Sequence, residues 1–301
     1  MIDRRRFITA LLGGAASLGG LGSLATLAGC HGREQAGQGA EREGARLVSI
    51  GGALTELAYA LGIGEQLVGA DTSSYFPSAA AALPKVGYQR KIAAEGVIGL
   101  GPSLVLHTES AGPATALEQI AAAGIELASF PEPRTLEQAR ARIQAFAARV
   151  GRVDEGEALL ARLDAELAEV ARLRGGATST PSVLFVYARG ADVLMVGGRE
   201  TPAATMIEAA GGRLAFDHAE YQPLSAEAVI AAAPEVLLVT ERGLGSVGGS
   251  SGLLTQPGLA ETPAGRAKRV VALDDLGLLG FGPRTGATLQ ALTRALHPEL
   301  A

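Results

Sequence analysis

The chain has no Trp, and aromatic residues make up only 4% of its 301 residues. A surface that stacks nucleic-acid bases therefore has little to be built from, and the formal net charge of −5 disfavours a polyanionic partner. The single Cys excludes an internal disulfide and a thiolate metal cluster. Hydrophobic residues, in contrast, reach 48%, which is enough for a large core. We expect a globular protein that does not bind nucleic acid.

The N-terminus has the features of an export signal. A basic start, Arg4-Arg5-Arg6, precedes a weakly hydrophobic stretch that is too rich in Gly to favour a spanning helix, which predicts a signal peptide over residues 1–29. The arginines before Phe7 resemble a twin-arginine signal, and the general secretion route stays open. The stretch ends in LAGC, which resembles a lipoprotein processing site and makes Cys30 the predicted lipidated first residue. The alternative is an uncleaved membrane anchor with an incidental thiol.

Residues 30–45 are polar, rich in Gly and without apolar periodicity, so we expect a flexible tether after Cys30. The protein is therefore expected outside the cytoplasm, in the periplasm or at the cell surface. The lipid on Cys30 is its only expected membrane contact, and the sequence leaves open which membrane carries it.

One pattern occurs twice in the chain. Residues 86–109 and 219–241 both contain Tyr-Gln, then a Glu, a Val-Ile pair, a Pro and, after an apolar run, Thr-Glu. From Glu95 and Glu227 onward the copies align without a gap, although more than a hundred residues separate them. Such a wide separation indicates two similar lobes rather than a short-period solenoid. We expect a cleft between the lobes.

Apolar strands alternate with helical stretches on both sides of the middle of the chain. The pattern predicts α/β lobes with mainly parallel sheets over 46–134 and 175–301. Predicted strands cover 46–50, 67–70, 104–107, 125–129, 183–187, 236–240 and 270–272, and predicted helices cover 54–61, 95–100, 114–123, 203–210, 227–233 and 285–296. Residues 135–174 show helical spacing that is interrupted only around Gly151. We expect one long interlobe helix there, or two joined end to end, which permits little hinge bending.

These residues resemble the class of substrate-binding proteins that serve ABC importers of haem, vitamin B12 and ferric siderophores. The strings SIGGALTELAYALG (49–62), LPKVGYQRKIAAEGV (83–97) and LLGFGPRT (278–285) look like the haem-binding branch. The resemblance implies two α/β lobes joined by one long helix, ferric haem as the transported ligand, and an ABC permease homodimer with its ATPase as the partner.

The VGYQR string (86–90) contains a candidate iron site. A phenol oxygen is a hard donor that suits ferric iron, and a nearby guanidinium favours a phenolate or pairs with a carboxylate. The resemblance implies that Tyr88 is the axial iron ligand and that Arg90 lies at the haem edge. From the residues alone, a Tyr that caps a loop and a solvated Arg remain the alternative.

The second repeat differs in its charge. Tyr221 takes the place of Tyr88, but Pro223 takes the place of Arg90. We therefore expect Tyr221 to be a wall or hydrogen-bonding residue of the cleft rather than a second ligand.

Two further arginines and one His of the C-terminal lobe are candidates. Arg242 follows a predicted strand, where a parallel sheet presents its ligand-facing residues, and we assign it to a haem propionate. Arg189 stands where some proteins of the resembling class have a His, so one bound haem is expected rather than two. His218 is the best remaining candidate for a sixth iron ligand. No His-x-x-x-His motif occurs among the four His, which disfavours a zinc- or manganese-binding protein.

Glu95 and Glu227 occupy equal places in the repeats, near the start of a predicted helix, where the helix dipole favours a carboxylate. The resemblance implies that they dock onto basic residues of the two permease subunits. A symmetric pair of charges suits a two-fold symmetric partner.

Enzyme motifs are present only in part. The segment 243–252 matches a dinucleotide-binding Gly pattern and a nucleophile pattern around Ser250, but neither has its strand and helix context. We expect a flexible Gly/Ser loop there and no enzyme. The alternatives left open are a cobalamin or ferric-siderophore binder of the same class, and a lipoprotein scaffold or sensor whose cleft binds a partner.

Overall fold

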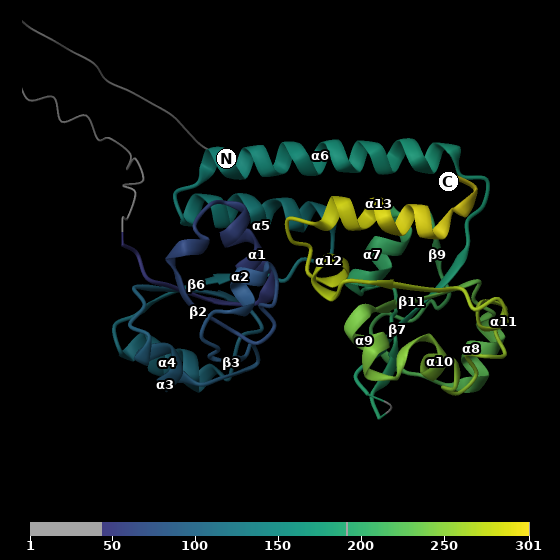
Figure 1. The fold of residues 1–301 in the computed structure, drawn as a ribbon, viewed down its shortest axis with the longest axis horizontal. Coiled ribbons are helices and arrows are strands. Elements are labelled where there is room, and N and C mark those ends of the chain that lie inside the picture. The colour runs from purple at the N-terminus through teal and green to yellow at the C-terminus, as the bar shows by residue number, and fades with distance from the viewer. Residues whose placement is uncertain (1–43, 191, 301) are drawn as a thin grey trace, which may run out of the picture. The chain divides into compact units, whose positions relative to one another are not determined.

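Each half of the protein contains one α/β lobe, as Figure 1 shows. The computed structural model describes residues 44–190 and 192–300, so the predicted signal peptide, Cys30 and most of the tether lie outside the described residues. Across the described ranges, no helix is long and apolar enough to span a membrane.

The N-terminal lobe has a four-stranded parallel sheet in the order β2-β1-β5-β6. Its strands are β1 (Leu47–Ile50), β2 (Leu67–Ala70), β5 (Leu104–Thr108) and β6 (Glu126–Phe130). Helix α1 (Gly52–Ala60) packs on one face, and helices α3 (Ala94–Gly99) and α4 (Ala114–Ala122) pack on the other. Strand β1 is buried along its whole length because both faces of the sheet are covered. Shorter elements are η1 (Gly64–Gln66), α2 (Ser78–Ala81), β3 (Gly87–Tyr88) and β4 (Lys91–Ile92).

The C-terminal lobe has a six-stranded mixed sheet in the order β10-β8-β7-β11-β12, with β9 also paired to β7. The parallel strands are β7 (Ser182–Ala188), β9 (Arg213–Leu214), β11 (Val236–Thr240) and β12 (Val270–Leu273). The antiparallel strands are β8 (Leu194–Val196) and β10 (Gln222–Pro223). Helices α7 (Pro202–Ala209) and α13 (Thr285–Leu296) cover one face, and α8 (Ala226–Ala232), α10 (Gly249–Leu254) and α11 (Pro263–Arg266) cover the other. The remaining elements are α9 (Glu241–Ser246), α12 (Asp275–Leu279) and η2 (Pro298–Leu300).

The helical region between the lobes differs from the expectation of one helix, or two joined end to end. Helix α5 (Leu136–Arg149) and helix α6 (Val153–Gly176) pack side by side (Figure 1). The chain reverses at Gly151, whose φ of +70° lies in the left-handed region that favours glycine at a helix C-terminus. Side-by-side packing lets both helices bury apolar residues, since Phe146 and Leu163 lie together in the N-terminal core.

Helix α6 is a long helix that extends across both lobes. Its residues Leu159, Leu160 and Leu163 belong to the core of the N-terminal lobe, and Val170 belongs to the core of the C-terminal lobe. Helix α13 packs along it (Figure 1). The two lobes therefore share one continuous rigid element.

The predicted strands and helices of the two lobes lie within two residues of the observed ones. The Gly/Ser segment 243–252 is the clear exception, because it forms parts of helices α9 and α10 rather than a flexible loop. Thr240 starts α9, since its side-chain oxygen accepts a hydrogen bond from the Gly243 amide at 3.1 Å.

Candidate functional site

A cavity of ≈ 840 Å³ lies between the two lobes, within the usual size range of small-molecule sites. Residues at or just beyond the carboxyl ends of β1, β5, β7 and β11 line it, among them Gly51, Thr108, Ala188 and Thr240. Ligand sites of parallel sheets lie at the carboxyl ends of the strands. In this protein the carboxyl ends of strands from both lobes face the same cavity.

Tyr88 and Arg90 lie on a small hairpin of the N-terminal lobe. Strands β3 and β4 pair antiparallel, and Gln89 and Arg90 form the turn between them. Gly87 precedes Tyr88 with a φ of +104°, and a Cβ there would lie 2.6 Å from the Lys91 carbonyl oxygen. Because only glycine fits at that position, Gly87 keeps the hairpin tight.

The Tyr88 side chain is 36% exposed and lines the cavity. Within the described residues its hydroxyl has no hydrogen-bond partner, so the oxygen is available to a ligand. The Arg90 guanidinium also lines the cavity, and its nearest carboxylate oxygen, on Glu132, is 3.9 Å away. An exposed ion pair of this length is weak, so Arg90 is available to a ligand carboxylate.

The structure adds Tyr187 to the sequence-based candidates. Tyr187 lies near the end of β7 and lines the cavity from the C-terminal lobe. The Nε of Arg189 donates a hydrogen bond to its hydroxyl, and this bond raises the pKa of Arg189 although burial opposes it. Tyr187 and Arg189 have the same Tyr-x-Arg spacing as Tyr88 and Arg90, a signal that was present in the sequence. The cavity therefore has a phenol and a guanidinium on each wall.

Arg242 lines the cavity from the first turn of α9. Its guanidinium carbon lies 4.8 Å from the centre of the Tyr75 ring, and its backbone amide donates to the Asp275 carboxylate at 3.2 Å. Burial raises the pKa of the Asp275 carboxyl above its ordinary value. Within the described chain, no carboxylate forms an ion pair with the Arg242 guanidinium.

Tyr221 lies in the wall of the cavity, 5.6 Å from Tyr187 and 6.4 Å from Phe185 between ring centres. Burial raises the pKa of Tyr221 to about 12, which opposes a phenolate at this position. His218 is not among the cavity-lining residues. Its Nδ1 lies 2.7 Å from the Glu220 carbonyl oxygen.

Cationic side chains outnumber acidic ones around the cavity. The lining includes five Arg, at 90, 134, 142, 189 and 242, and four acids, at 132, 200, 220 and 275. Arg134 is paired with Glu220 at 2.7 Å. Arg142 is buried and donates to the carbonyl oxygens of Gly280 and Phe281, and burial lowers its pKa to about 10. Among the described residues, Arg90, Arg189 and Arg242 remain without a short ion pair, so the cavity offers three guanidiniums to an anionic group of a ligand.

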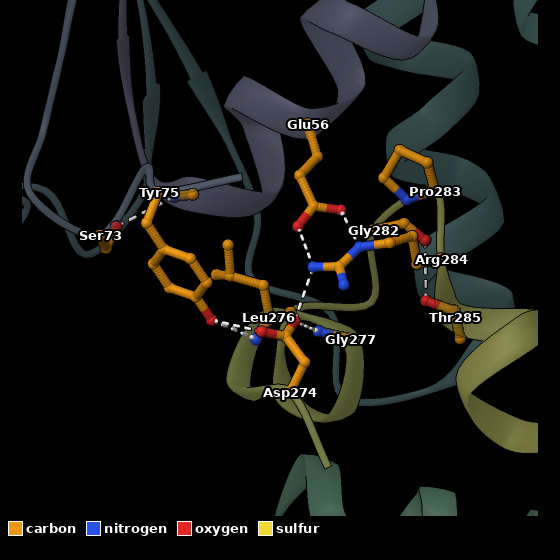
Figure 2. Close-up of polar contacts among 12 residues, drawn as sticks. Glu56, Ser73, Tyr75, Asp274, Leu276, Gly277, Gly282, Pro283, Arg284 and Thr285 are labelled. Atoms are coloured by element: carbon orange, nitrogen blue, oxygen red, sulfur yellow. Dashed lines mark hydrogen bonds and ion pairs between the residues drawn. The ribbon is translucent and has the colours of Figure 1, made fainter. Parts of the chain in front are cut away.

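An ion-pair network connects the lobes next to the cavity (Figure 2). The Arg284 guanidinium contacts the buried Glu56 carboxylate at 2.5 and 3.0 Å and the Asp274 carboxylate at 2.6 Å. The Tyr75 hydroxyl donates to Asp274 at 2.9 Å. Glu56 and Tyr75 belong to the N-terminal lobe, whereas Asp274 and Arg284 belong to the C-terminal lobe, so the network crosses the interface twice.

Glu95 and Glu227 lie in the first turns of α3 and α8, and both side chains are exposed. Hydrogen bonds from its own backbone amide and from Ser225 lower the pKa of Glu227. One turn further along each helix is an exposed isoleucine, Ile98 in α3 and Ile230 in α8. Both helices lie on the side of their lobe that is remote from α6 (Figure 1).

The described residues contain no cluster of three or more His, Cys, Asp or Glu side chains that is able to hold a metal ion. The side chains that the structure brings together in the cavity are instead phenols and guanidiniums. Two α/β lobes that share a long helix, with a cavity between them, define the class of two-lobe ligand-binding proteins.

The chain belongs to the periplasmic binding protein family, whose model matches residues 47–276. This is a family of extracytoplasmic binding proteins, and the expected two-lobe α/β fold is confirmed.

Solved structures of similar proteins cover nearly the same part of the chain. The apo form of the periplasmic haem-binding protein RhuT from Roseiflexus sp. RS-1 is 48% identical, with a TM-score of 0.82 over 85% of this chain and 99% of that one. The periplasmic haem-binding protein BhuT in complex with two haems is 44% identical, with a TM-score of 0.79 over 85% and 99%.

A curated relative has a different ligand in its name. The vitamin B12-binding protein of Photorhabdus laumondii is 28% identical over 197 residues, which are 65% of this chain and 70% of that protein.

Proposed function

We propose that the protein captures ferric haem in the interlobe cavity and delivers it to an ABC permease for uptake. The observation that carries this proposal is the pairing of a phenol with a guanidinium on each wall of one cavity. The iron of haem is open on both faces and is able to bind a phenol oxygen. The two carboxylates at one edge of haem are able to pair with guanidiniums. The similarity to haem-binding proteins supports the choice of ligand.

Tyr88 is the proposed iron ligand from the N-terminal lobe. Its hydroxyl is in the cavity with no partner among the described residues, and bound ferric iron stabilises a phenolate by its own charge. Tyr221 is the proposed wall residue, since its burial opposes ionisation.

The proposed partners of the propionates are Arg90, Arg189 and Arg242. None of the three is tied to a carboxylate by a short ion pair within the described chain, so each is able to make charge-assisted hydrogen bonds with a ligand.

We propose that the protein binds one haem. Tyr187 gives the C-terminal lobe a phenol of its own, and the similar BhuT structure holds two haems. His218 lies outside the cavity lining, so we do not include it among the proposed ligands.

Titration of the purified protein with hemin, followed by visible spectra, tests the ligand and the site. We expect a saturable 1:1 ferric high-spin spectrum with a tyrosinate charge-transfer band. This band is expected to disappear in Tyr88→Ala and to persist in Tyr59→Ala, because Tyr59 lies outside the cavity lining. Saturation at two equivalents would contradict the single haem.

No saturable hemin binding by the wild type would contradict the proposed function. Cobalamin and ferric siderophores then come first, and the relationship to vitamin B12-binding proteins makes cyanocobalamin the next ligand to titrate. If none of these ligands binds, the remaining interpretation is a scaffold or sensor.

The proposed partner is a permease homodimer with its ATPase, and Glu95 and Glu227 are the proposed docking residues. They lie at equal positions of the two lobes, on exposed helix starts, and each has an exposed isoleucine one turn away. Two equivalent acidic and apolar patches fit a partner that presents the same basic surface twice.

Charge reversal tests the docking proposal. Glu95→Lys combined with Glu227→Lys is expected to abolish stimulation of the permease ATPase while leaving hemin affinity unchanged, with Glu118→Lys on the exposed face of α4 as the control. Full stimulation by the double variant would remove the docking role. The proposed lipid anchor is tested separately, since Cys30→Ser is expected to move the protein from the membrane fraction to the soluble fraction.

A further inference from the structure

Tyr75 connects the cavity to the interlobe network. It lies in the loop that follows β2 in the N-terminal lobe, and its ring lines the cavity. The Arg242 guanidinium, which comes from the C-terminal lobe, lies 4.8 Å from the centre of that ring. This is the distance of a cation–π contact, so a side chain of one lobe supports a cation of the other.

The Tyr75 ring is fixed in place from the far side. Its hydroxyl donates to the Asp274 carboxylate at 2.9 Å and accepts a hydrogen bond from the Leu276 amide at 3.2 Å (Figure 2). Burial and the neighbouring Asp274 carboxylate raise the pKa of Tyr75 well above its ordinary value. The hydroxyl therefore stays protonated and continues to donate to Asp274.

Asp274 is itself held from two directions. Its Oδ1 accepts from the Gly277 amide at 2.9 Å, which caps helix α12, and from Arg284 at 2.6 Å. Arg284 is anchored on the buried Glu56 and lies 3.9 Å from the centre of the Phe76 ring, next to Tyr75 in the chain. The orientation of the Tyr75 ring is therefore set before any ligand enters the cavity.

The position over the Tyr75 ring suits Arg242 for binding a carboxylate. A guanidinium that lies over a ring face keeps the N–H groups at its edge free, and those groups match a carboxylate in pairs. A guanidinium that is already held loses less rotamer freedom when the ligand binds.

We infer that Tyr75 is a positioning residue that holds Arg242 for a carboxylate of the ligand, an inference that depends on the proposed haem function. The contact crosses the lobe interface, because Tyr75 belongs to the N-terminal lobe and Arg242 to the C-terminal lobe.

The test compares hemin with hemin dimethyl ester, which lacks free carboxylates. Tyr75→Leu removes the ring face, and the loss of a cation–π contact weakens hemin affinity by about 2- to 30-fold. Affinity for the ester is expected to stay unchanged, because Arg242 has no carboxylate to bind there. Tyr59→Leu, the same substitution outside the cavity lining, is expected to change neither affinity.

Two further variants separate positioning from general damage. In the Arg242→Ala background, Tyr75→Leu is expected to have no further effect on hemin affinity, which is the result of a coupled pair in a double-mutant cycle. Tyr75→Phe keeps the ring and the fold, so its affinity for hemin is expected to exceed that of Tyr75→Leu.

Equal losses for hemin and its ester in Tyr75→Leu, or no loss for either, overturn the inference while the haem function stands. Absence of hemin binding in the wild type overturns the haem function itself. The two failures are therefore distinct.

Discussion

Tyr187 and Arg189 show how one hydrogen bond joins two ligand-facing groups. The Arg189 Nε–H donates to the Tyr187 hydroxyl, and its guanidinium carbon lies 5.3 Å from the centre of the Tyr187 ring. Tyr187→Phe removes the acceptor and leaves the ring. We expect hemin affinity to fall by about 2- to 10-fold, the effect of one lost hydrogen bond, while the tyrosinate band from Tyr88 persists.

Titrations of Tyr187→Phe and Tyr88→Phe in parallel check this prediction. If the tyrosinate band is lost in Tyr187→Phe and kept in Tyr88→Phe, the iron ligand is Tyr187. Ser250→Ala, in helix α10 outside the cavity lining, is the matched loss of a hydroxyl.

Glu56 is a buried carboxyl whose burial raises its pKa from 4.5, against the opposing effect of Arg284. The folded protein therefore holds this proton at pH values where the unfolded chain has released it. Stability from this group is fully present below the unfolded pKa and is lost as pH rises through the folded pKa. In Glu56→Gln the group does not titrate, so the stability of the wild type relative to this variant is expected to fall with rising pH in that window.

Urea unfolding of both proteins between pH 4 and 8 measures this difference. A wild-type advantage that instead grows with pH would mean that Arg284 lowers the pKa of Glu56 more than burial raises it. Glu65→Gln, at an exposed position in η1, is the control for the substitution of a Glu by a Gln.

The hairpin of β3 and β4 is the element that presents Tyr88 and Arg90. Gly87→Ala places a methyl group 2.6 Å from the Lys91 carbonyl oxygen at a φ of +104°. We expect the free energy of unfolding to fall by about 1–3 kcal/mol and hemin affinity to fall with it, because the turn that carries Arg90 must shift.

Gly99→Ala is the matched control, since a Cβ at this helical position has no atom within 4 Å. In a helix the same substitution is expected to stabilise by about 0.4–1 kcal/mol. Thermal unfolding and hemin titration of both variants check the contrast. If Gly87→Ala has the stability and affinity of the wild type, the hairpin geometry is not needed for binding.

The elements differ in how far they could be predicted. Strands β1, β5, β7 and β11 are short apolar runs that are buried along nearly their whole length, and periodicity alone locates them. The two-residue strands β3 and β10 are too short for any periodicity. The sequence does not predict helix α9 because its Gly content disfavours a helix, whereas the Thr240 cap and packing against β7, β11, β12 and α10 stabilise it in the folded protein.

At the scale of the whole molecule, two of the connections between the lobes are a shared helix and an ion-pair network. Helix α6 contributes to both cores, and the network of Glu56, Arg284, Asp274 and Tyr75 joins the lobes beside the cavity. A hinge motion would have to separate Arg284 from the buried Glu56 carboxylate, which is unfavourable because the carboxylate would lose its partner. We therefore expect the lobes to keep their separation when hemin binds.

Spin labels on Ala123→Cys and Ser250→Cys, one exposed position in each lobe, measure this separation. The expected shift in the interlabel distance on hemin binding is below about 2 Å. A shift of about 5 Å or more would indicate hinge closure. In Glu56→Ala, which breaks the network, the distance distribution is expected to broaden.

The two-lobe α/β fold could be predicted without the structure, because apolar periodicity depends on neighbours along the chain and the internal repeat can be read by comparing two segments of the sequence. The sequence also singled out Tyr88, Arg90 and Arg242, all of which line the cavity. The packing of the lobes was needed to show that Tyr187 faces the same cavity, that His218 does not line it, and that Tyr75 of one lobe supports Arg242 of the other. These relations join residues that are far apart in the chain, so they exist only after the lobes have packed on helices α5 and α6.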